Sequence, residues 1–189
     1  SQYKCKDLGE LNYCLGMEIT RNPITINITL SQNKYTRDVL KRFGHANSKP
    51  ALTPIEPGIQ LALSEPGGEN LIYPYREVVG SLMYLMVCTR PDISYAVSYL
   101  ARYLNNHGKA HHAAANYLLR YLKNTSELGI TYHHKETFDL IGYSDSDWAS
   151  DIITRKSTTG YLFMMAGGAI SWKSRLQPTV AISSSEAEY

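Results

Sequence analysis

The amino-acid sequence predicts an α+β fold, in which a β-hairpin is followed by a helical unit and then by a second, mixed β-sheet. β-Branched and apolar residues dominate two stretches on either side of Asn22-Pro23, a pair that favours a turn. Apolar residues then recur at helical spacing through the middle of the chain. After Gly129, short strand-like stretches alternate with polar turns. Together these three observations predict separate β, α and β units in chain order.

The strands of the hairpin are expected over residues 11–19 and 24–30, where β-branched and other apolar side chains favour an extended backbone. Ser31 can cap a helix that Gly44 would end. The apolar stripe of this helix consists of Tyr35, Val39, Leu40 and Phe43. Residues 46–72 are rich in proline and glycine, so we expect a loop there.

Further helices are expected between residues 77 and 124. The first covers EVVGSLMYLMV, and Thr89 to Asp92 interrupts it, with Pro91 near the first position of the next helix. That next helix has the clearest helical periodicity of the chain, in Ile93, Ala96, Val97, Leu100, Ala101 and Leu104. A last helix over about 111–124 would bury Ala114, Leu118, Tyr121 and Leu122.

The C-terminal part is expected to form strands joined by short polar turns. The predicted strands are residues 129–133, 138–145, 158–165, 168–173 and 179–182. Ser183 and Glu186 then have the spacing of a capping box, which indicates that a new helix starts close to residue 184.

Composition and charge exclude several classes of protein. The net charge of +2 and pI of about 8.3 are too weak to indicate nucleic-acid binding on their own. The basic residues are dispersed over many elements, which suits either a phosphate-tracking surface or an ordinary solvated face. No apolar run is long enough to span a membrane, and the first residues lack the apolar core that is typical of a signal peptide. Both ends of the chain look cut from a longer protein.

Carboxylates gather around one predicted strand end and one predicted helix start. Asp145, Asp147 and Asp151 lie in GYSDSDWASD, and Glu186 and Glu188 lie at the start of the last helix. An aspartate at a strand end beside a glutamate in a first helical turn can hold a hard divalent cation such as magnesium. The same residues are also typical of turns and helix starts. Spacing alone favours that second interpretation.

The histidine pairs His111-His112 and His133-His134 do not predict a metal site. Adjacent side chains point to different sides of a helix or a strand, so they chelate one ion poorly.

The whole chain resembles the copia-type (Pseudoviridae) retrotransposon polyprotein across the junction of reverse transcriptase and RNase H. The motifs that carry the resemblance follow the family's order and cover nearly all of the chain: KDLGELNYCLGMEI, LSQNKYTRDVLKRFG, YREVVGSLMYLMVCTRPDISYAVSYLARY, LRYLKNT, GYSDSDWASD, RKSTTGY and AISWKSRLQPTVAISSSEAEY.

The resemblance implies three regions. Residues 1–30 would be the end of the reverse transcriptase palm, residues 31–127 the thumb and connection, and residues 128–189 the N-terminal part of an RNase H domain. In the first region, Leu15, Gly16, Met17 and Glu18 look like the primer grip, which positions the primer terminus.

For RNase H, the resemblance implies Asp145 and Glu188 as catalytic, magnesium-binding residues, with Asp147 and Glu186 as alternatives. The implied partners are an RNA–DNA hybrid or a template–primer duplex and the remainder of the polyprotein, with no membrane. The implied location is a virus-like particle in the cytoplasm, with nuclear entry of the parent complex left open.

The same resemblance places the polymerase carboxylates, in a Tyr-x-Asp-Asp segment, before residue 1, and two further RNase H aspartates after residue 189. We therefore expect this stretch alone to be inactive as a polymerase and as a nuclease. His112 and Ala115-Asn116 depart from the Trp and the Lys-Arg pair that are common in the family. This departure leaves open a second interpretation, a non-catalytic remnant or exapted module that binds nucleic acid or a protein.

Overall fold

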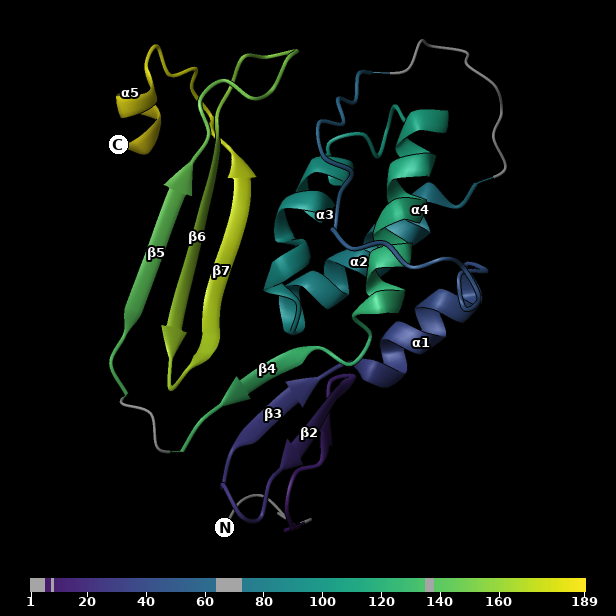
Figure 1. Cartoon of the computed structure of the whole chain (residues 1–189), viewed down its shortest axis with the longest axis vertical. Coiled ribbons are helices and arrows are strands. Elements are labelled where there is room, and N and C mark those ends of the chain that lie inside the picture. Colours follow the sequence, from purple (N-terminus) through teal and green to yellow (C-terminus); the bar gives the residue numbers. More distant parts are fainter. Residues whose placement is uncertain (1–5, 8, 64–72, 135–137) are drawn as a thin grey trace.

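A computed structural model describes residues 6–7, 9–63, 73–134 and 138–189. The described chain contains a bundle of helices with one antiparallel sheet at its lower end and a second antiparallel sheet beside it (Figure 1). This arrangement is mixed α and β, as the sequence predicts. Within the proline-rich 46–72 stretch, residues 46–63 form no helix or strand, and residues 64–72 lie outside the described part.

The first sheet has the strand order β1-β2-β3-β4 and is antiparallel throughout. Its strands are β1 (Tyr13–Cys14), β2 (Met17–Arg21), β3 (Ile28–Ser31) and β4 (Gly129–Tyr132). The predicted hairpin is therefore present as β2 and β3. The strand predicted at 129–133 is present as β4, but it pairs with β3, about one hundred residues earlier in the sequence, and not with the C-terminal strands. Strand pattern identifies a strand but not its distant partner.

A two-residue turn at Leu15-Gly16 joins β1 to β2. Both residues have positive φ, 47° and 72°, as in the turns that match the twist of a hairpin. A side chain at Gly16 would place its Cβ 2.6 Å from the hydroxyl of Tyr84, which donates a hydrogen bond to the Leu15 carbonyl. Glycine is therefore required here by both the backbone conformation and the close approach of Tyr84.

The helical unit contains most of the hydrophobic core. Its elements are α1 (Asn33–Arg42), α2 (Tyr75–Cys88), the 3-10 turn η1 (Pro91–Ile93), α3 (Ser94–Ala101) and α4 (Lys109–Asn124). The residues predicted to form the helical stripes are largely buried, among them Val39, Leu40, Val97, Leu100, Leu118 and Leu122. Ser31 does not cap α1 as we expected, because it is the last residue of β3, and the helix begins after Gln32.

A buried arginine connects the start of α3 to the end of α4. Arg90 is 2% exposed and donates two hydrogen bonds to the Asp92 carboxylate, at 2.9 and 2.7 Å. It also donates to the backbone carbonyl and the hydroxyl of Thr125, at 2.9 and 2.7 Å. Tyr121 donates a further hydrogen bond to Asp92. The break in the helical pattern at Thr89 to Asp92 is thus a polar connection inside the bundle.

The second sheet has the order β5-β6-β7, with β5 (Ile141–Ser146), β6 (Thr158–Met165) and β7 (Gly168–Leu176). It is wholly antiparallel, and the expected mixed sheet is not found among the described strands. The stretch 179–182 is not a strand, because its backbone serves other partners: the carbonyl of Ala181 accepts from Trp148 and the amide of Ile182 donates to Glu186. The predicted capping by Ser183 is present at the start of α5 (Ser184–Glu188).

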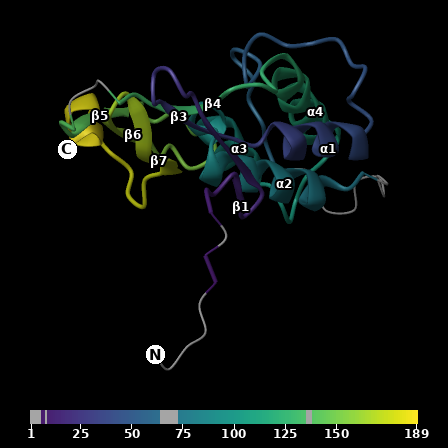
Figure 2. The same ribbon diagram turned by 90° about the horizontal axis from the view of Figure 1, so that it is seen from below.

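The two sheets meet at one corner but do not merge. Tyr132 at the end of β4 donates a hydrogen bond to the carbonyl of Ala169 on β7, at 2.7 Å. The indole of Trp172 on β7 donates to the carbonyl of Met86 on α2, at 2.8 Å. The second sheet therefore lies against α2 and α3, and Figure 2 shows β7 as the strand of this sheet nearest to them.

Candidate carboxylate site and nucleic-acid interface

The three aspartates around the end of β5 have different environments. Asp147 accepts hydrogen bonds from the Thr158 amide and the Ser150 hydroxyl, both at 2.6 Å, so each of its oxygens is occupied. Asp151 is 7% exposed and forms an ion pair with Arg102. Asp145 lies on β5 and is exposed. Its carboxylate has no hydrogen-bond or ion-pair partner within the described part of the chain.

Asp151 is held as a carboxylate. Burial acts to raise the pKa of Asp151, but hydrogen bonds from Thr154 and the nearby Arg102 guanidinium outweigh burial and lower it. The Arg102 Nη1 to Asp151 Oδ1 distance is 3.2 Å. Asp151 is therefore bound to its neighbours and is not available for a ligand.

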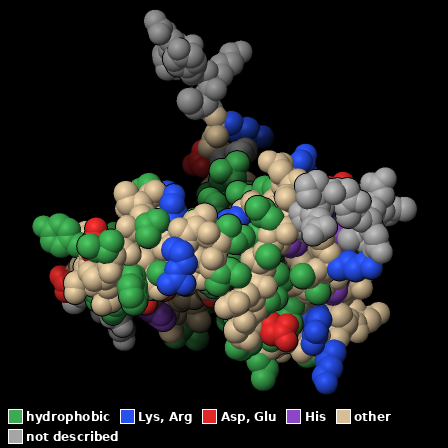
Figure 3. Space-filling model, turned by 90° about the horizontal axis from the view of Figure 1, so that it is seen from above, with side chains coloured by type: hydrophobic (Ala, Val, Ile, Leu, Met, Phe, Trp, Pro, Cys, Tyr) green, Lys and Arg blue, Asp and Glu red, His purple; other side chains and the backbone are tan. Residues whose placement is uncertain are grey.

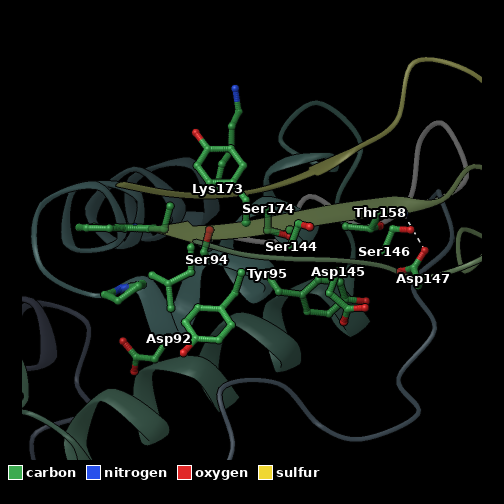
Figure 4. A pocket seen from close by; sticks show the side chains of 16 residues that line it. Asp92, Ser94, Tyr95, Ser144, Asp145, Ser146, Asp147, Thr158, Lys173 and Ser174 are labelled. Carbon is green, nitrogen blue, oxygen red and sulfur yellow. Dashed lines mark hydrogen bonds between the residues drawn. The ribbon is translucent and has the colours of Figure 1, made fainter. Parts of the chain in front are cut away.

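Asp145 lines a cleft between the second sheet and the η1–α3 segment. The cleft has a volume of about 630 Å³, and its walls include Tyr143 on β5, Trp172 on β7 and Tyr95 on α3. Side chains alternate between the faces of a strand, and Figure 4 shows Asp145 on the same side of the sheet as Tyr95, with Lys173 on the other side. A ligand bound in this cleft would meet aromatic walls and one free carboxylate.

The two glutamates of α5 also differ. Glu186 accepts from the Ile182 amide at 2.8 Å, and its own amide donates to Ser183, so it serves the start of the helix. Glu188 accepts from the amide of Ser146, the residue after Asp145, at 3.2 Å. The structure thus brings Glu188 to the end of β5, and its bond there is to the backbone. The alternatives Asp147 and Glu186 are both engaged in local bonds.

Asp145 and Glu188 carry the kind of oxygen ligand that magnesium binds, and both lie near the end of β5. Magnesium prefers carboxylate oxygens and retains several waters, so two carboxylates from different elements can anchor it. The Asp145 carboxylate is free to bind, and the Oε2 of Glu188 accepts no hydrogen bond from the described residues. No group of three or more His, Cys, Asp or Glu side chains that could hold a metal ion occurs among the described residues.

The primer-grip candidates lie at the turn and the first half of β2. Leu15 is 79% exposed at the tip of the turn, while Met17 and Glu18 belong to β2 and are half-buried. The Glu18 carboxylate accepts from the Lys34 amide at the start of α1, at 3.2 Å. Glu18 therefore also helps to cap α1, a contact between distant segments that sequence spacing could not predict.

The exposed cations are most concentrated on α1. Lys34, Arg37, Lys41 and Arg42 are exposed, and Arg37 forms an exposed ion pair with Glu127 at 3.2 Å. Elsewhere the lysine and arginine side chains form several separate groups, as the view from above shows (Figure 3). The dispersion predicted from the sequence is therefore present on this face of the molecule.

Sequence reasoning missed a buried cluster of histidines and tyrosines. His107 and His112 share a hydrogen bond of 2.8 Å, and His111 is 2% exposed. Tyr73 stacks on His112 with ring centroids 4.3 Å apart, and Tyr75 stacks on His107 at 4.5 Å. We expected His111 and His112 to point to different sides of the helix, yet both are buried, because His107 and the two tyrosines surround the start of α4. The Tyr-rich composition was the only available signal.

The comparisons with known proteins cover the whole chain. The Retrovirus-related Pol polyprotein from transposon TNT 1-94 of Nicotiana tabacum is 46% identical over 193 residues, spanning 99% of this chain. That from transposon RE1 of Arabidopsis thaliana is 42% identical over 190 residues and spans 100% of this chain. An uncharacterized mitochondrial protein of Arabidopsis thaliana is 36% identical over 193 residues, which make up 77% of its own length. Over its whole length, the chain is therefore similar to one segment of the retrovirus-related Pol polyproteins of plant transposons.

The chain spans 14% and 13% of the lengths of these two transposon polyproteins. No model of a protein family matches it, and no solved structure does. None of the helices in the described part of the chain has both the length and the apolarity needed to cross a membrane.

Proposed function

We propose that this chain is the part of a transposon Pol polyprotein in which a reverse transcriptase joins an RNase H domain. Residues 1–30 end the palm, residues 31–127 form the thumb and connection, and residues 128–189 begin the RNase H domain, with β4 returning to the palm hairpin before β5 starts the second sheet. The complete enzyme copies element RNA into DNA and degrades the RNA of the hybrid. It does so with the remainder of the polyprotein, in a virus-like particle.

The observation that carries the proposal is the combination of similarity and geometry at Asp145. Similarity to transposon Pol polyproteins extends over the whole chain. Within GYSDSDWASD, Asp145 is the aspartate without a local partner, and Glu188 is the glutamate that reaches the end of its strand. A catalytic carboxylate has to be available to its ligand, and these two residues meet that requirement better than Asp147 or Glu186.

The residues of this stretch would supply part of the hydrolytic site. Asp145 and Glu188 would hold magnesium, which when bound activates water and stabilises the leaving oxygen in phosphodiester hydrolysis. The Ser146 amide orients Glu188, and Asp147 closes the loop after β5 by accepting from Thr158. The exposed cations of α1 would contact the phosphates of the duplex, and Leu15 would contact the primer strand.

A non-catalytic module is the second candidate. This candidate is favoured by the small number of available metal ligands near the end of β5. Asp145 and Glu188 are the candidate ligands there, and the described residues contain no group of three or more that could hold a metal ion. In such a module the cations of α1, or the exposed Leu15 at the tip of the β1–β2 turn, would bind nucleic acid or a protein. The two candidates differ in whether the complete polyprotein hydrolyses a hybrid.

We expect the isolated chain to bind an RNA–DNA hybrid with a strong dependence on salt. Phosphate contacts release counterions, and each contact contributes about 0.9 to the slope of log affinity against log salt. Replacing Lys34, Lys41 and Arg42 by alanine should lower that slope by about 2–3, since each cation lost removes about one unit. Fluorescence anisotropy of a labelled hybrid between low and physiological salt measures both quantities.

The control is Lys173→Ala, an exposed lysine on the opposite face of the second sheet, which should leave the slope unchanged. A flat salt dependence, or no binding at low ionic strength, would refute the duplex-binding role of α1 and favour the protein-binding module.

A further inference from the structure

Arg102 connects the end of α3 to the second sheet. It follows Ala101, the last residue of α3, and its guanidinium lies over the ring of Tyr99, 5.1 Å from the centroid. Its Nη1 donates to Asp151 at 3.2 Å, and its Nη2 donates to the Thr158 hydroxyl at 3.3 Å. Arg102, directly after α3, thus contacts two buried residues of the C-terminal part of the chain, Asp151 and Thr158.

One partner of Arg102, Asp151, lies on the loop that follows β5, and the other, Thr158, is the first residue of β6, directly after that loop. This loop, residues 147–157, is closed by backbone bonds from Asp151 to Lys156 and from Arg155 to Asp151, at 3.2 and 2.7 Å. Ala149 and Arg155 both have positive φ, 52° and 58°. Such conformations cost energy and persist only where surrounding contacts impose them. The bonds from Arg102 are among those contacts.

The same loop determines how β5 ends. The Thr158 amide donates to the Asp147 carboxylate at 2.6 Å, and the Asp147 amide donates to the Thr158 carbonyl at 3.1 Å. Asp147 is two residues from Asp145, and strand pairing places Asp145 opposite Gly160, two residues beyond Thr158. Any displacement of Thr158 therefore changes the position of the strand end that carries Asp145.

We propose that Arg102 is a positioning residue for hydrolysis, through which the helical unit fixes the loop 147–157 and so the orientation of Asp145 in the cleft. This rests on the proposed function, because it takes Asp145 as the reacting carboxylate. Arg102 acts through Asp151 and Thr158 and does not touch Asp145. A duplex held by the helices would then be kept in register with the carboxylate site.

The first test measures the loop in the chain itself by hydrogen–deuterium exchange. In Arg102→Ala the amides of Asp151, Arg155 and Thr158 should exchange about tenfold faster, because the loop opens locally. Arg102→Lys keeps the positive charge but loses the planar guanidinium with its two donor nitrogens, so its exchange rates should be intermediate. The matched control is Arg120→Ala: Arg120 also lies over a tyrosine and donates to a carbonyl, but within the helical unit. Unchanged loop exchange in Arg102→Ala would overturn the proposal.

The second test uses the complete Pol polyprotein. Arg102→Ala should raise the magnesium concentration for half-maximal RNA hydrolysis about tenfold, as is typical when a residue supporting metal-binding groups is lost. The rate at saturating magnesium should stay near that of the parent. A lower rate at every magnesium concentration, without that shift, would show a merely structural role and overturn the proposal. If Asp145→Asn leaves hydrolysis intact, the proposed function fails, whereas the exchange result still tests the link from Arg102 to the loop.

Discussion

Replacing Arg90 by alanine is expected to lower the free energy of unfolding by about 2–3 kcal/mol, because it removes a buried donor from an ion pair whose carboxylate is 30% exposed. Arg90 is 2% exposed, and its guanidinium makes all of its hydrogen bonds to Asp92 and Thr125. Without Arg90 the Thr125 carbonyl, at the end of α4, loses its side-chain donor, and the Asp92 carboxylate keeps only the hydrogen bond from Tyr121. Urea denaturation followed by circular dichroism measures the change.

The control for this prediction is Arg37→Ala. Arg37 also pairs with a carboxylate, Glu127, but the two side chains are 59% and 68% exposed. Exposed pairs contribute about 0–1 kcal/mol because water and salt screen them. Equal losses of stability in the two variants would contradict the structural role that we assign to Arg90.

Acidification from pH 7 towards pH 5 is expected to destabilise the helical unit through its histidine cluster. Burial lowers the pKa of His107, His111 and His112, and the proximity of the three rings lowers it further for His111 and His112. The unfolded chain therefore binds protons first as the pH falls below the ordinary histidine pKa of about 6.5. Stability is fully present above that pH and is lost below it, by about 1.4 kcal/mol for each unit by which a pKa is lowered.

Geometry supports the same direction. The amide of Gly108 donates to His111 Nδ1, so the neutral ring carries its proton on Nε2, which is buried without a partner among the described residues. A second proton on the His107–His112 pair would place two donors against each other, 2.8 Å apart. His112→Phe should make stability less dependent on pH, whereas His134→Ala, at an exposed histidine, should not. An unchanged pH dependence in His112→Phe would refute this account.

The helices and their buried faces could be predicted from the sequence because their signals are local. Val39, Val97 and Leu118 lie on apolar stripes with helical spacing, and all three are fully buried. The capping of α5 by Ser183 was predictable for the same reason, since the bond joins residues three apart.

The long-range contacts could not be predicted in this way. Nothing near Gly129 shows that β4 pairs with β3, and nothing near Ser31 shows that the residue belongs to that ladder and not to a helix cap. Within GYSDSDWASD, spacing treats the three aspartates alike. Asp147 and Asp151 differ from Asp145 through the nearby Ser150 and Thr154 and through the distant Thr158 and Arg102, and spacing does not show the distant partners.

The measurement that most directly tests the central claim is RNA hydrolysis by the complete Pol polyprotein containing Asp145→Asn. With magnesium and a labelled RNA–DNA hybrid, we expect hydrolysis to fall about 100-fold or more, since a metal ligand contributes several kcal/mol to the transition state. Primer extension by the same preparation should continue and shows that the protein is folded. Asp147→Asn, in the same cleft, should retain most of the hydrolysis. Full hydrolysis by Asp145→Asn, or loss confined to Asp147→Asn, would contradict the assignment of Asp145 as the catalytic carboxylate.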